Sequence, residues 1–142
     1  MSSEWVKVER CLRRLSEGNL ASIAKTMESM YSVNARAELT SALTCVILDA
    51  TLLPTRAPPR VITDIAMLLA VLHSRVGCEV TASFLHQLVD MYQRVSADMV
   101  TGKQADNALL LLAQLYNFKV HLAAIFEKTF EFHNIYHIFA KS

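Results

Sequence analysis

Apolar residues recur at spacings of three and four along most of the chain, which is the pattern of amphipathic helices. The first such stripe predicts a helix ending near residue 15 and consists of Trp5, Val8, Cys11, Leu12 and Leu15. The same spacing predicts further helices over about 20–33, 35–53, 59–76, 79–95, 103–117 and 119–140. No stretch alternates with period two, so the pattern predicts an all-α fold.

Turn-forming residues separate the predicted helices. Gly18 suits a left-handed stop of the first helix, and Asn19 and Asn34 suit the N-caps of the second and third. Pro59 fits the first turn of the fourth helix, where a missing N–H costs nothing, and Gly77 fits its end. The sequence therefore divides into short-linked helices.

Consecutive helices pair into hairpins over about 3–33, 35–76 and 79–117, with a terminal helix at about 119–140. A hairpin of roughly 40 residues has the period of HEAT-type repeats. The fourth helix is apolar nearly all round and must be covered on several sides, which places it inside a stack. The fold class predicted is an α-solenoid of antiparallel helical hairpins, with about three HEAT-type repeats and a partial fourth. A closed four-helix bundle is the alternative.

The composition narrows the class of protein. The chain has 142 residues, of which 53% are hydrophobic and 19% charged, so it is long enough to fold as one domain and is not a disordered linker. The formal net charge of +1 gives no general attraction to nucleic acid or to an anionic membrane. We expect an intracellular protein without a secretory signal, because Met1–Lys7 lacks an apolar core, and without a membrane span, because the longest apolar run is Ile65–Leu72.

Cysteines and histidines give little sign of chemistry. Three widely separated cysteines, Cys11, Cys45 and Cys78, fit neither a disulfide framework nor a zinc site, and we expect them in the core and in a reducing compartment. The remaining candidates are interpreted as ordinary helix residues: His73, His86 and His121.

No catalytic motif is present, so no catalytic residue, cofactor, metal or small-molecule substrate is assigned. His133 and His137 have the four-residue spacing of two metal ligands, and Glu127 or Glu131 could supplement them. Two surface histidines are the preferred interpretation of this pair. A metal-dependent enzyme is the alternative.

A cluster of guanidinium groups is a sharper candidate. Arg10, Arg13 and Arg14 lie at i, i+3 and i+4, so they share a face near the end of the first helix, away from its apolar stripe. They either form a solvated face that complements the helix dipole, or bind carboxylates or phosphates of a partner. A second polar group lies at the start of the predicted sixth helix and consists of Lys103, Asp106 and Asn107. These residues either cap that helix or contact a partner.

Several segments in succession resemble the middle domain of translation initiation factor 4G, and within that superfamily the nucleolar Nom/Sgd-type proteins of small-subunit ribosome assembly. The resemblance spans about Val6 to Val120. The segments that carry it are Leu12-Arg-Arg-Leu-Ser-Glu-Gly-Asn-Leu-Ala-Ser-Ile23, Thr40-Ser-Ala-Leu43, Leu72-His-Ser-Arg-Val-Gly-Cys-Glu-Val80 with Phe84-Leu85, Gly102-Lys-Gln-Ala-Asp-Asn107 and Ala113-Gln-Leu-Tyr-Asn-Phe118.

The resemblance implies a non-enzymatic crescent of HEAT repeats that binds a DEAD-box RNA helicase of the initiation factor 4A type and modulates it. The helicase contacts map onto the end of the first helix and the following turn: Arg13, Arg14, Ser16, Glu17 and Asn19. It also implies a nucleolar or nuclear location and a role in pre-ribosome assembly and rRNA processing; without the family, the location expected is cytoplasmic.

Two alternatives stay open. The first hairpin could bind RNA or a pre-ribosomal particle directly through Lys7, Arg10 and Lys25 together with the two helicase-contact arginines. A translation or splicing adaptor, or a decoy of the same fold, is the other. The chain is shorter than a full middle domain of this family, and its segment Glu131–Ser142 does not match the family's continuation, so contacts of later repeats are not transferred.

Overall fold

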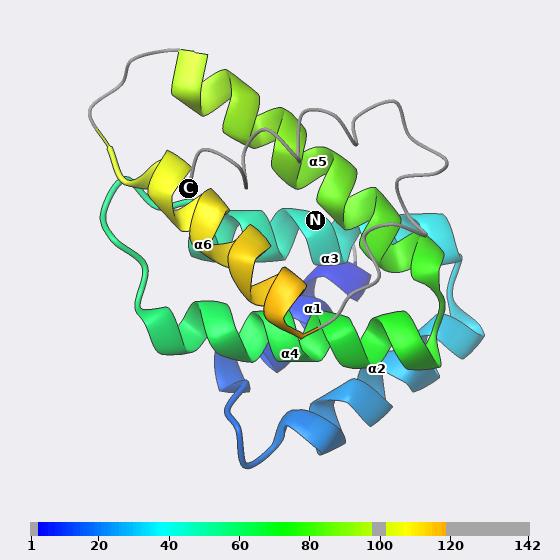
Figure 1. Cartoon of the computed structure of the whole chain (residues 1–142). Coiled ribbons are helices and arrows are strands. Elements are labelled where there is room, and N and C mark those ends of the chain that lie inside the picture. Colours follow the sequence, from blue (N-terminus) through cyan, green and yellow to red (C-terminus); the bar gives the residue numbers. More distant parts are fainter. Residues whose placement is uncertain (1–2, 98–101, 119–142) are drawn as a thin grey trace.

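A computed structural model describes residues 3–97 and 102–118 and shows six helices (Figure 1). They are α1 (Ser3–Arg14), α2 (Leu20–Val33), α3 (Arg36–Thr51), α4 (Pro59–Arg75), α5 (Cys78–Ala97) and α6 (Gln104–Asn117). No strand occurs in these two ranges. The all-α prediction is therefore confirmed. The predicted terminal helix, with His121, His133 and His137, lies outside the described residues.

The helices form two stacked rows. In one row α1 packs on α3 and α3 on α5; in the other α2 packs on α4 and α4 on α6 (Figure 1). The rows are joined by contacts of α4 with α5 and of α5 with α6. Because each helix packs mainly within its own hairpin or on an adjacent one, the arrangement is that of an α-solenoid, as predicted, and not of a closed bundle.

One apolar core runs through all six helices. α4 lies at its centre, in contact with α2, α3, α5 and α6. Its side chains Leu68, Leu69 and Leu72 are fully buried. Each contributes about 1.5–3 kcal/mol to folding by leaving water. The nearly all-round apolar character of this segment is thus explained by neighbours on several sides.

The predicted start and stop of the fourth helix are both confirmed. Pro59 is the first residue of α4. Gly77 follows the end of the same helix with φ of +150°, a conformation that side-chain-bearing residues rarely adopt. Its N–H and that of Val76 both donate to the carbonyl of Leu72, at 3.2 and 2.8 Å. The sharp turn into α5 therefore depends on the absence of a Cβ at this position.

Several local expectations were wrong. Gly18 is not in the left-handed region, since the positive φ among the described glycines belongs to Gly77. Asn34 does not cap α3, whose N-cap is Ala35; its amide instead donates to the carbonyl of Met30 at the end of α2 (2.9 Å). Side chains of asparagine can serve either helix end, and here the preceding helix offers the free carbonyl.

The cysteines were also misassigned in part. Cys11 is half-buried, but Cys45 and Cys78 are exposed. Cys45 lies on the outward side of α3, between the buried residues Thr44 and Val46, and Cys78 is the first residue of α5. Successive side chains of a helix point about 100° apart, so a residue between two buried neighbours can itself face solvent, as Cys45 does.

Candidate functional site

The predicted arginine cluster is exposed at the end of α1. Arg10, Arg13 and Arg14 all face solvent. Arg13 donates to the carboxylate of Glu9 one turn earlier, with Nη2 and Oε1 2.7 Å apart and the arginine side chain 77% exposed. An exposed pair of this kind adds about 0.3–0.5 kcal/mol, so the guanidinium can exchange it for a partner's carboxylate at little cost.

Positive charge at this end of α1 also acts on Cys11. Burial raises the pKa of its thiol above the ordinary value, and the charges of Arg14 and Arg10 oppose that rise. The thiol therefore stays protonated at neutral pH, and the charge at this end of α1 comes from the guanidinium groups.

The turn after α1 is held by the side chain of Asn19. Its Oδ1 accepts the backbone N–H of Ser16 at 2.7 Å, and its Nδ2 donates to the carbonyl of Arg14 at 2.5 Å. Asn19 thus closes the end of α1, whereas we expected it to cap α2 with its side chain. The result is a fixed segment, which we call the first-hairpin turn, comprising the end of α1 and the turn after it, residues 13–19.

The first-hairpin turn brings together the residues assigned by resemblance to helicase binding. Arg13, Arg14 and Glu17 are exposed, and Ser16 and Asn19 are half-buried. Both signs of charge are present within one turn of chain. The geometry therefore allows contacts with acidic, basic and neutral hydrogen-bonding groups on one opposing surface, with Asn19 acting through the turn's shape.

The second predicted group divides in two. Lys103 and Asp106 are exposed, and their charged groups lie 3.5 Å apart. Asn107, in contrast, is 1% exposed, so its side chain does not reach a partner. We had expected Asn107 as a surface contact or a helix start, and the structure gives it an internal role.

Asn107 fastens the loop between α3 and α4. Its Oδ1 accepts the N–H of Ala57 at 3.0 Å, while its Nδ2 donates to the carbonyls of Leu53 and Thr55 at 3.2 and 3.0 Å. Lys103 adds a bond from its backbone N–H to the carbonyl of Pro54 at 3.0 Å. We call these bonds the loop clasp; they hold residues 53–57 against the start of α6.

The loop clasp also involves residues that sequence reasoning missed. The amide of Gln104 donates to the carbonyl of Leu52 at 3.3 Å. The loop that is held displays Arg56, and Arg60 follows in the first turn of α4; both are exposed. The only signal in the sequence is the polar composition of the segment before α6.

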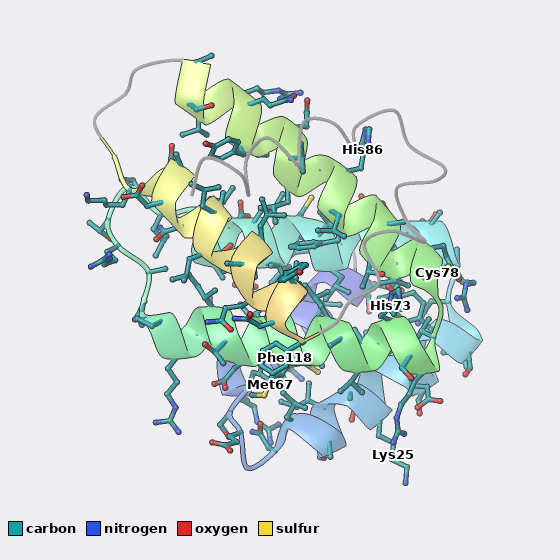
Figure 2. The ribbon with its side chains drawn as sticks, in the orientation of Figure 1. Lys25, Met67, His73, Cys78, His86 and Phe118 are labelled. Carbon is teal, nitrogen blue, oxygen red and sulfur yellow. The ribbon has the colours of Figure 1, made fainter. Side chains whose placement is uncertain are left out.

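The other candidates for RNA contact are more scattered. Lys7 is exposed on α1, and Lys25 is exposed on α2, where its side chain points away from the body of the protein (Figure 2). Acidic residues are interspersed, with Glu4 and Glu17 on the same hairpin. These lysines consequently do not extend the arginine cluster into a uniformly basic face.

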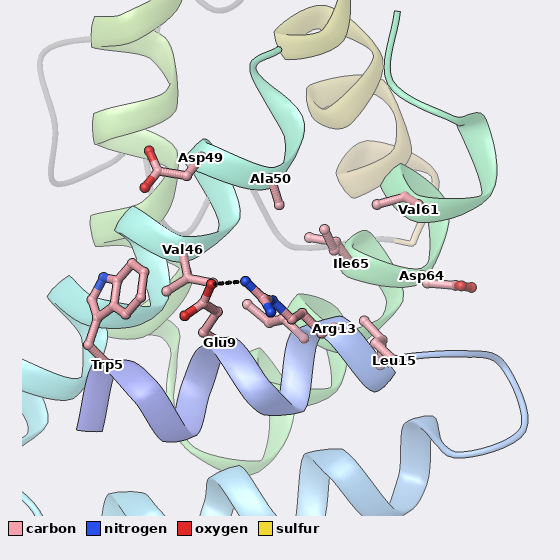
Figure 3. A pocket seen from close by; sticks show the side chains of 11 residues that line it. Trp5, Glu9, Arg13, Leu15, Val46, Asp49, Ala50, Val61, Asp64 and Ile65 are labelled. Carbon is pink, nitrogen blue, oxygen red and sulfur yellow. Dashed lines mark hydrogen bonds and ion pairs between the residues drawn. The ribbon is translucent and has the colours of Figure 1, made fainter. Parts of the chain in front are cut away.

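A groove lies beside the arginine cluster, between α1, α3 and the first half of α4 (Figure 3). Its volume is about 440 Å³. The residues that line it are Trp5, Glu9, Leu12, Arg13, Leu15, Val46, Asp49, Ala50, Val61, Asp64 and Ile65. Several of these residues belong to the apolar helix stripes, but the groove itself has no sequence signal, because it forms only where helices from two hairpins meet.

Two histidines lie on α4 and α5. His73 on α4 shares a hydrogen bond with the hydroxyl of Thr81 on α5, with Nδ1 and Oγ1 2.5 Å apart. His86 is exposed on α5 (Figure 2). Within the described ranges no three histidine, cysteine or acidic side chains gather as metal ligands, and none of the helices there is long and apolar enough to span a membrane.

Comparison with known proteins identifies relatives. The chain is 35% identical over 113 residues to the nucleolar MIF4G domain-containing protein 1 of Mus musculus, and 37% identical over 114 residues to a homologue of that protein in Drosophila melanogaster. A third relative is the suppressor of glycerol defect protein 1 of Schizosaccharomyces pombe, at 26% identity over 119 residues.

These matches cover about four-fifths of the chain: 80%, 78% and 80%, respectively. The chain spans only 13% of the length of the mouse and fly proteins and 15% of the yeast one. No family model matches the sequence, and no solved structure gives a significant match. With an all-helical solenoid and relatives at this level of identity, the chain belongs to the MIF4G-type, Nom/Sgd-like domains.

Proposed function

We propose that this domain is a non-enzymatic scaffold that binds a DEAD-box RNA helicase of the initiation factor 4A type during nucleolar small-subunit ribosome assembly and rRNA processing. The nucleolar setting is supported by the names of the mammalian and fly relatives. Helicase binding is supported by the position of the exposed arginines beside a rigid turn.

The observation that carries the proposal is the first-hairpin turn. The side chain of Asn19 bonds to the backbone of Arg14 and Ser16, so Arg13, Arg14 and Glu17 are presented from a fixed backbone. A fixed backbone lowers the conformational entropy lost on binding. The arginine forks then pair with carboxylates on a helicase lobe, each through two parallel hydrogen bonds.

The ATP chemistry in this scheme belongs to the helicase. The scaffold contributes by binding one geometry of the helicase better than another, since a ligand shifts a conformational equilibrium only by its difference in affinity for the two states. Lys103 and Asp106, with Arg56 on the loop fastened by the loop clasp, are exposed and could form a second contact.

The test is binding of the purified chain to initiation factor 4A type helicases in the presence of a non-hydrolysable ATP analogue and RNA. Replacing Arg13 and Arg14 by glutamate should weaken the complex at least about tenfold, because two attractive contacts become repulsive. Arg94→Glu is the matched control: Arg94 forms the same kind of exposed i,i+4 pair, with Asp90 at 2.7 Å, but on α5.

Two results would count against helicase binding. The first is failure of the wild-type chain to bind any helicase of this class. The second is equal weakening by the α1 variant and the Arg94 control, because a non-specific charge effect would then explain the loss. Circular dichroism of each variant establishes that the fold is retained.

Direct RNA binding is the second candidate, favoured by the exposure of Arg13, Arg14, Arg56 and Arg60, because Arg13 and Val61, the neighbour of Arg60, border the same groove. Each phosphate neutralised releases counterions, so RNA affinity would fall steeply as salt is raised. A salt titration of chain–RNA binding without helicase separates the two. In this candidate Lys7→Glu, Arg10→Glu and Lys25→Glu should reduce the slope, whereas helicase scaffolding predicts no such RNA complex.

A further inference from the structure

The groove between α1, α3 and α4 has the composition of a peptide-binding site. We propose that it binds a segment of a partner protein in which a large apolar side chain is followed by arginine or lysine. This proposal does not depend on helicase binding, since the groove is lined mainly by residues outside the first-hairpin turn.

The apolar part of the groove fits a large side chain. Its walls carry Leu12 from α1, Val46 from α3 and Ile65 from α4, and Val61 at its edge is 39% exposed. A volume of about 440 Å³ falls within the range of sites that bind small ligands. An aromatic or aliphatic side chain with part of its backbone therefore fills it and removes this exposed apolar surface from water.

The charged part of the groove requires a cation. Three carboxylates line it, those of Glu9, Asp49 and Asp64, against the single guanidinium of Arg13. Arg13 is already bonded to Glu9 (Figure 3). Among the described residues, no hydrogen bond or ion pair is formed by the carboxylates of Asp49 and Asp64. The groove consequently carries uncompensated negative charge.

Asp64 is the most enclosed of these three acidic residues. It is only 7% exposed, the one charged residue among the buried positions of the described chain. Its carboxylate oxygens still contact water, because the one buried side-chain oxygen or nitrogen without a hydrogen-bond partner among the described residues is Thr44 Oγ1, so Asp64 is hydrated but not paired with a cation. A guanidinium or ammonium group that entered the groove would supply that partner in a partly desolvated place, where charge-assisted bonds are strongest.

A peptide is favoured over a nucleic acid by the sign of this charge. RNA phosphates would be repelled by the groove, and a free metal ion would leave its apolar walls unused. A segment with one apolar and one basic side chain satisfies both parts at once. The groove thus complements a basic partner, while the neighbouring first-hairpin turn, with Arg13 and Arg14, complements an acidic one.

The test uses fluorescein-labelled peptides of Gly and Ser that contain one Phe followed, at increasing spacing, by two arginines. Matched peptides carry Glu in place of the arginines or Ser in place of the Phe. Fluorescence anisotropy with the full chain should show binding by at least one Phe–Arg peptide and by neither matched form. Asp64→Asn and Asp49→Asn should each weaken that binding about three- to tenfold.

Two further variants make the result decisive. Ala50→Trp places a bulky side chain in the groove from an exposed position of α3 and should abolish binding while all carboxylates remain. Glu38→Gln, which removes an exposed carboxylate of α3 outside the groove, should change nothing. The proposal is overturned by absence of binding across the panel, by equal binding of the Glu peptides, or by binding that survives Asp49→Asn and Ala50→Trp.

Discussion

Replacing Asn107 by alanine should lower the free energy of unfolding by about 3 kcal/mol. The substitution removes the three bonds that the Asn107 side chain contributes to the loop clasp. The N–H of Ala57, a residue that is 0% exposed, is left without its partner, which costs about 1–3 kcal/mol. The carbonyls of Leu53 and Thr55 each lose a donor, at about 0.5–1 kcal/mol apiece, since water reaches them more readily.

The measurement is urea unfolding followed by circular dichroism, with Asn117→Ala as the matched control. Asn117 is an exposed residue at the end of the same helix, so its replacement should change stability by less than about 0.5 kcal/mol. Asn107→Asp keeps the acceptor for Ala57 but places a carboxylate against two carbonyl oxygens, and should be as harmful as alanine.

A loss of less than about 1 kcal/mol for Asn107→Ala, close to that of the control, would refute the reasoning. It would mean that the loop between α3 and α4 is held by its own conformation and by apolar packing. A loss near the expected value would instead assign Asn107 a structural role. The two charged residues of the Gly102–Asn107 motif, Lys103 and Asp106, would then be the ones exposed to a partner.

Two further predictions concern the turn between α4 and α5. Gly77→Ala should destabilise the fold by about 1–3 kcal/mol in thermal or urea unfolding, because its φ of +150° is strained for alanine; a neutral effect contradicts the observed turn. The pKa of Glu79 is lowered from 4.5, first by a hydrogen bond from its own backbone N–H and then by Arg36. The ionised carboxylate therefore stabilises the fold above about pH 4.5, and this contribution is lost as the pH falls below that value. Glu79→Gln should therefore flatten the acid limb of the stability profile, and an unchanged limb would show that the pairing with Arg36 does not stabilise the native state.

The spacing of apolar residues in the sequence was sufficient to predict the helices. Their spacing of apolar residues, together with Pro59 and Gly77, placed most boundaries within a few residues of those observed. Helix formation depends on contacts three or four residues apart, which a single sequence displays directly. The solenoid class followed from the same information, but the packing partners did not: α1 packs on α3 and α2 on α4 instead of α1 on α2.

The sequence did not show which of two neighbouring helix ends an asparagine side chain would bond to, or which side of a helix would be buried. Asn19 and Asn34 each stand between two helices, and the sequence cannot say which helix end their amides will serve. The same ambiguity affects Cys45, whose burial depends on which side of α3 meets α5. In each case the deciding energy comes from packing of whole helices, not from the residue's own propensity.

The chain by itself determined an all-helical solenoid with an arginine-bearing first hairpin, because these properties arise from neighbours within a few residues. Only the tertiary structure decided that Asn107 is internal, since its bond to Ala57 joins residues 50 positions apart. The groove with its buried Asp64 was decided in the same way, by three helices from two hairpins meeting side by side. Contacts between distant segments are set by how the hairpins stack, and that geometry has no local signature.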